Sequence, residues 1–120
     1  MRTSTPVLSA TSLIGDDVKN TKGENLGDIK DIMIDLDSGR IEYAVLSFGG
    51  FLGMGDKLFA VPFEALRVDT ADECMILNVD KEKLKSAPGF DKDEWPNFAD
   101  SSFRDTIHSY YGTKSYRKAA

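Results

Sequence analysis

An apolar run at residues 41–48 restricts the possible folds more than any other feature of this sequence. Side chains of a β-strand point alternately to its two faces. In this run both sets of alternate positions are apolar: Ile41, Tyr43 and Val45 on one face, and Ala44, Leu46 and Phe48 on the other. A strand that is apolar on both faces must be covered on both, so the run predicts a central strand of a sheet.

Further strand patterns surround this run. Residues 8–14 lead toward a short first strand, and turns are expected at 15–17 and 21–25. Residues 26–36 end in an alternation of Ile32, Ile34 and Leu36 with Asp31, Met33 and Asp35, which is typical of a half-buried strand. The segment 37–40 has hairpin-turn residues, and strands are expected at 58–61, 67–69 and 74–79, with Pro62 marking a strand end or an edge. Short strands separated by turns predict a sandwich or a small barrel.

A glycine-rich stretch with large apolar side chains follows the central strand. Its residues are Phe48, Gly49, Gly50, Phe51, Leu52, Gly53 and Met54. Large apolar side chains such as those of Phe51, Leu52 and Met54 are not needed in a loop that only connects two strands. They either fold back over the end of the barrel or contact a partner, and we favour a contact surface.

The chain changes character after residue 79. Asp80 is expected to cap a short helix at 81–87, and a second helix is expected to start near residues 100–102. Four residues of this second helix form an apolar stripe at helical spacing: Phe103, Ile107, Tyr110 and Tyr111. The stripe must pack on the barrel of its own chain or on a neighbouring chain. Phe90, Trp95 and Phe98 precede it, and they either seal the open end of the barrel or contribute to a subunit contact.

Three segments resemble the PRC-barrel domains, a family that includes a barrel of the photosynthetic reaction-centre H subunit and one of a ribosome maturation factor. These segments are 23–29, 34–50 and 55–66, and the tail at 87–96 is similar to that of stand-alone bacterial members. The resemblance covers residues 8–88 and leaves 89–120 as a C-terminal aromatic and helical extension. It implies an all-β fold, a small six-stranded barrel, that serves as an assembly or docking module without catalysis.

Motifs for catalysis or metal binding fail when tested residue by residue. A calcium loop starting at Asp35 would have Gly39 at its fifth position and Leu46 at its twelfth, where oxygen ligands are required. Gly50 and Gly55 have the spacing of a phosphate-binding loop, but Asp56 stands where lysine is needed. We therefore expect no enzyme activity, no cofactor and no metal. His108 is expected at the surface, and Cys74, the single cysteine, is expected to be buried.

Charge and hydropathy narrow the choice of partners. The net charge of −5 opposes binding to nucleic-acid phosphates. No apolar run is long enough to cross a bilayer, and the N-terminus lacks a secretory signal, so we expect a cytoplasmic protein. The leading hypothesis is a protein-interaction module that forms a homodimer. Two alternatives remain: a barrel that binds a small ligand or a metal, and a peripheral subunit of a photosynthetic or other membrane complex.

Overall fold

The computed structural model describes residues 9–48, 57–69 and 71–113, and the apolar loop residues 49–54 therefore lie outside the described part. Its six strands are β1 (Asp17–Lys19), β2 (Asn25–Asp35), β3 (Arg40–Phe48), β4 (Lys57–Pro62), β5 (Leu66–Asp69) and β6 (Cys74–Leu77). Its helices are α1 (Ala10–Leu13), α2 (Lys81–Lys85) and α3 (Ser101–Tyr111), with a 3-10 turn, η1 (Phe63–Ala65), between β4 and β5. Strands followed by helices are found as expected from residue 17 on, but residues 10–13, in the stretch expected to lead into a first strand, form the helix α1 instead.

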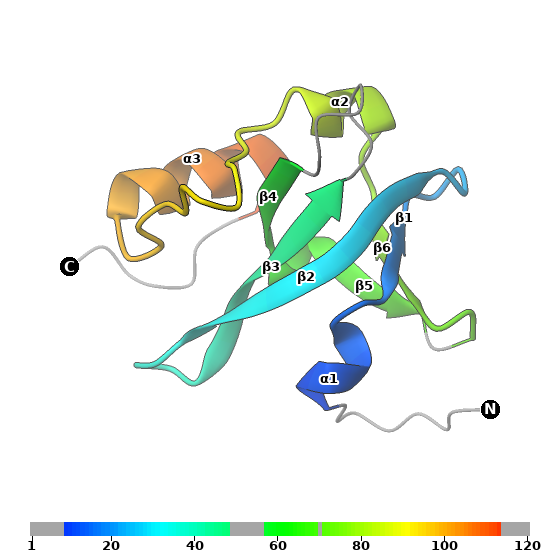
Figure 1. Cartoon of the computed structure of the whole chain (residues 1–120), viewed down its shortest axis with the longest axis horizontal. Coiled ribbons are helices and arrows are strands. Elements are labelled where there is room, and N and C mark those ends of the chain that lie inside the picture. The colour runs from blue at the N-terminus through cyan, green and yellow to red at the C-terminus, as the bar shows by residue number, and fades with distance from the viewer. Residues whose placement is uncertain (1–8, 49–56, 70, 114–120) are drawn as a thin grey trace.

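The six strands form one curled sheet in the order β4-β3-β2-β1-β6-β5 (Figure 1). All neighbours pair antiparallel except β1 and β6, which run parallel. The expected all-β, six-stranded barrel class is confirmed, with the sheet curled into a half-barrel. As expected, β3 is central, lying between β2 and β4, and Pro62 ends the edge strand β4.

The main core fills the inside of the curl. Ala44, Leu46 and Phe48 of β3 and Phe59 and Val61 of β4 point into it. The same core takes residues from other elements: Leu13, Val18, Leu26, Ile29, Met75, Leu77, Leu84 and Ala87. α1 and α2 therefore each close part of the curl with a single leucine.

A second, smaller core covers the outer face of β3 and β4. Tyr43, Ala60 and Ile107 are buried there, and Phe98 and Phe103 pack against them. The chain reaches this face by running beside the edge strand: Phe90 and Leu58 exchange two backbone hydrogen bonds of 2.8 and 3.0 Å. β3 is thus buried on both faces, the inner one by the barrel and the outer one by the C-terminal segment.

Two further local expectations are wrong. Residues 17–19 form β1, although Asp17 was expected in a turn and no strand was expected between the turns at 15–17 and 21–25, because pairing with β2 and β6 stabilises a strand too short to show a pattern of its own. At the end of β2, Ile34 is 55% exposed and Leu36 is 92% exposed, whereas Asp35 is only 8% exposed. The β2–β3 hairpin extends beyond the main core (Figure 1), so the rest of the barrel does not cover the apolar side chains at its tip.

Candidate functional site

An aromatic cluster forms the outer surface of the second core. The Phe98 ring lies 5.5 Å from Tyr43, 5.4 Å from Phe103 and 6.1 Å from Trp95, measured between ring centroids. Phe90 adds to the cluster 5.3 Å from Trp95. These tilted and edge-on arrangements are the favourable ones for aromatic pairs. Trp95 remains 39% exposed at the rim.

The apolar stripe of α3 packs on its own chain. Asp100 caps the helix by accepting a hydrogen bond from the Ser102 backbone N–H, as its sequence predicts. Ile107 is 1% exposed against β3 and β4, and the half-buried Phe103 and Tyr111 pack around it. Tyr110 lies half-buried against the main core, and its hydroxyl donates a hydrogen bond to the Lys83 carbonyl of α2. The stripe therefore serves first to attach α3 to the barrel.

His108 is buried, and its expected place at the surface is wrong. Its ring is only 4% exposed because α3 turns it toward β3. Nδ1 lies 2.7 Å from the Thr113 hydroxyl, and Nε2 lies 4.0 Å from Oε2 of Glu42, which is also buried. Burial lowers the pKa of His108 below its ordinary value, since the charged imidazolium loses hydration.

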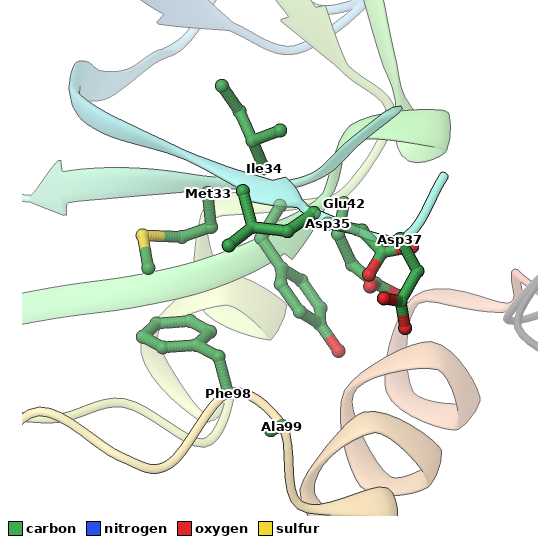
Figure 2. Close-up of a pocket in the computed structure, with 9 residues that line it drawn as sticks. Met33, Ile34, Asp35, Asp37, Glu42, Phe98 and Ala99 are labelled. Atoms are coloured by element: carbon green, nitrogen blue, oxygen red, sulfur yellow. The ribbon is translucent and has the colours of Figure 1, made fainter. Parts of the chain in front are cut away.

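A groove runs between the β2–β3 hairpin and the segment that precedes α3 (Figure 2). It holds about 380 Å³ and is lined by Met33, Ile34, Asp35, Leu36, Asp37, Glu42, Tyr43, Phe98 and Ala99. Met33 and Phe98 face each other at one end, and the carboxyl group of Asp37 lies toward the other (Figure 2). The groove combines apolar walls with an acidic end.

Only some of the residues that the sequence predicts as a contact surface lie close together in the structure. Trp95 reaches the groove through Phe98, a residue that the sequence analysis discussed but did not place among the site residues. Phe48 instead points into the main core, next to the point where the described part of β3 ends. Ile34 and Leu36 were missed because their alternation is typical of a buried face. Their place in a hairpin beside an acidic turn was the available signal.

Within residues 9–48, 57–69 and 71–113, no three His, Cys, Asp or Glu side chains are grouped as metal ligands. Among the helices of the same ranges, none has the length and apolar character needed to span a bilayer.

A scan against family models matches residues 6–84 to the PRC-barrel domain. The chain belongs to the PRC-barrel family. Among solved structures, this PRC-barrel protein is similar to a putative 16S ribosomal RNA processing protein, RimM, from Pseudomonas aeruginosa, with 19% identity and a TM-score of 0.43. The match covers 68% of this chain and 49% of that protein, so it spans about half the length of its neighbour. No curated protein sequence matches the chain.

Proposed function

We propose that this PRC-barrel protein is a non-enzymatic interaction module that docks a protein partner on the hairpin side of its barrel. One observation carries the proposal: Leu36 and Ile34 are exposed beside the groove, and apolar surface continues from there through Phe98 to Trp95. Small proteins rarely expose contiguous apolar surface without a use for it.

The proposed roles follow the two parts of the chain. Residues 8–88 supply the barrel and its hairpin, and residues 89–120 are the extension that carries Trp95 and Phe98 to the groove. The glycine-rich loop, with Phe51, Leu52 and Met54, is a second contact region proposed from the sequence. Burying one large apolar side chain gains about 1.5–3 kcal/mol, so several are needed to exceed the cost of association.

The proposal is tested by affinity enrichment from the native host with three full-length proteins. These are the wild type, the triple variant Ile34→Ser, Leu36→Ser and Trp95→Ser, and the control variant Ile14→Ser. Ile14 is an exposed apolar residue, 41% accessible, that does not line the groove. We expect a partner that the wild type and the control enrich equally and the triple variant does not. Equal enrichment by all three, or turnover in a broad substrate screen that survives purification, would contradict the proposal.

A further inference from the structure

His108 lies buried at the contact between α3 and the outer face of β3. It is the single histidine of the chain, and its ring centroid lies 5.9 Å from that of Tyr43. Nδ1 is 2.7 Å from the Thr113 hydroxyl, whereas Nε2 is buried and has no hydrogen-bond partner among the residues that the structure describes. An imidazolium has an N–H donor at both nitrogens, and a buried charge is costly without partners for its donors. The contact therefore accommodates the neutral ring better than the charged one.

Charged groups approach His108 from three elements. Glu42 of β3 places Oε2 4.0 Å from Nε2, which is too far for a hydrogen bond. Glu64 of η1 and Asp105 of α3 favour the charged ring, and Arg104 of α3 opposes it. Burial has the largest effect, so the pKa of His108 is lower than its ordinary value despite the acidic groups.

The attachment of α3 is separate from the pairing of the strands. Ile107 is its deepest contact, 1% exposed, and the half-buried Phe103 and Tyr111 pack beside it. Tyr111 adds no charge to the contact, because burial raises the pKa of its hydroxyl. The buried residues of the main core that the structure describes all lie outside α3, and none of the six strands pairs with it. α3 can therefore leave the barrel while the sheet stays folded, and a free helix of 11 residues is then only marginally stable.

We propose that protonation of His108 releases α3 from the barrel and uncovers the apolar outer face of β3 and β4. The charged ring gains hydration only when α3 moves away, so a fall in pH favours the released form. Phe98 and Tyr43, which line the groove beside the hairpin, both pack against Phe103 of α3, with ring centroids 5.4 and 6.0 Å apart. Release therefore removes a support of the groove and makes docking there depend on pH. This last step rests on the proposed function, whereas the release of α3 does not.

Proton linkage sets the size of the effect. In the released form the ring is in water, where its pKa is near 6.5. The stability of the docked form is therefore full above pH 6.5 and is lost as the pH falls below it. If the docked ring stays neutral, a fall from pH 7.5 to pH 5.5 raises the ratio of released to docked α3 by about tenfold, and any protonation in the docked form reduces this gain. We expect a rise of about five- to tenfold.

The first measurement is hydrogen exchange of the full-length wild type at pH 7.5 and pH 5.5, corrected for the intrinsic exchange rate at each pH. The amides of residues 105–111 report on α3, and those of residues 44–46, in the central strand, report on the sheet. We expect the α3 amides to open at least about tenfold more often than the β3 amides, and with little dependence on urea, since a local opening exposes little surface. The opening of α3 should rise about five- to tenfold at pH 5.5.

Two variants isolate the histidine. His108→Gln keeps a polar side chain but does not titrate, so its α3 opening should change by less than about twofold between the two pH values. Ser109→Ala, at the next and exposed position of the helix, should keep the wild-type change. The pKa of His108 is measured separately from its ring signals in the NMR spectrum, which are unambiguous in a chain with one histidine, and we expect a value below 6.5.

Three results overturn the inference. α3 amides that open only together with those of β3, with the same urea dependence, mean that the helix leaves only when the whole domain unfolds. An equal pH response of His108→Gln assigns the release to another group. A His108 pKa above 6.5 means that Glu42 and the other acidic groups stabilise the charged ring, so that a fall in pH strengthens the attachment of α3.

The exchange and the titration of the wild type decide the outcome even if the glutamine variant does not fold. All of these measurements are made without a partner, so their failure leaves the docking proposal to its own test.

Discussion

Among single residues, Gly27 lies where the backbones of two strands approach too closely for a side chain. Its φ is +119°, and a Cβ at this position would lie 2.1 Å from the carbonyl oxygen of Ser47 in β3. That oxygen belongs to the backbone of a central strand and cannot move aside. Gly39, in the hairpin turn, also has a positive φ of +75°, but a Cβ there would meet nothing within 4 Å.

We expect Gly27→Ala to lower the free energy of unfolding by more than about 3 kcal/mol, because it adds a steric clash to an unfavourable φ. Gly39→Ala has only the backbone term and should cost about 1 kcal/mol. Urea unfolding followed by circular dichroism measures both. Equal losses would mean that β2 and β3 separate without difficulty at Gly27.

His108 gives the stability a dependence on pH. Its pKa is lowered in the folded protein mainly by burial; Arg104 acts in the same direction, while Glu64 and Asp105 oppose it. The unfolded chain, with a pKa near 6.5, therefore binds the proton more readily. Stability from this residue is present above pH 6.5 and is lost as the pH falls below it.

We therefore expect the wild type to lose more stability than His108→Gln between pH 7.5 and pH 5.5. The glutamine variant retains a polar side chain but does not titrate, so the difference between the two urea midpoints isolates the histidine. Parallel pH profiles of the two proteins would show that His108 has the same pKa in the folded protein as in the unfolded chain.

Among the elements, α3 is attached to the barrel most deeply through Ile107, its least exposed side chain. Ile107 is packed between Tyr43 of β3 and Ala60 of β4, while its neighbours Thr106 and Ser109 are exposed. The helix covers the outer face of two strands that would otherwise expose apolar surface. Its removal should therefore affect both stability and solubility.

Truncation of that side chain tests the attachment. Ile107→Ala should lower the free energy of unfolding by about 2–5 kcal/mol, the usual range for a buried isoleucine. Ser109→Ala, on the exposed side of the same helix, should change it by less than about 0.5 kcal/mol. A small loss for both would mean that α3 contributes little to the barrel and that its apolar face is available to a partner.

For the whole molecule, the sequence predicts self-association. The glycine-rich loop was predicted from the sequence to carry Phe51, Leu52 and Met54 into a contact, and two-fold symmetric dimers are the commonest homo-oligomers. The exposed Ile34 and Leu36 give a second surface that could serve the same purpose.

We expect the wild type to dimerise and the double variant Phe51→Ser with Leu52→Ser to dimerise at least tenfold more weakly without losing its fold. Sedimentation equilibrium measures the association, and circular dichroism checks the fold. The variant Ile34→Ser with Leu36→Ser is the matched comparison. A wild type that stays monomeric at high micromolar concentration contradicts self-association, and a loss only in the second variant places the contact on the hairpin.

Features of the fold that depend on local pattern could be predicted from the amino-acid sequence. The two-sided apolar run of residues 41–48 fixed the central strand, Gly39 and its neighbours fixed the hairpin turn, and Asp100 fixed the start of α3. A glycine at a positive φ or a capping carboxylate acts through its nearest neighbours in the chain. Such features, together with the family resemblance, were sufficient for the fold class.

The face of each element that is covered depends on long-range packing and could not be predicted from local pattern. In β2, Leu26, Ile29 and Ile32 all lie in or against the main core although they are three residues apart, because irregularities in the β1–β2 and β2–β3 pairing displace the alternation. Burial that depends on tertiary packing also explains why two predictions were wrong: α3 buries His108 against β3, and the projecting hairpin leaves Leu36 exposed. Burial depends on residues far away in the chain, so the alternation of apolar residues in β2 could not by itself assign the groove.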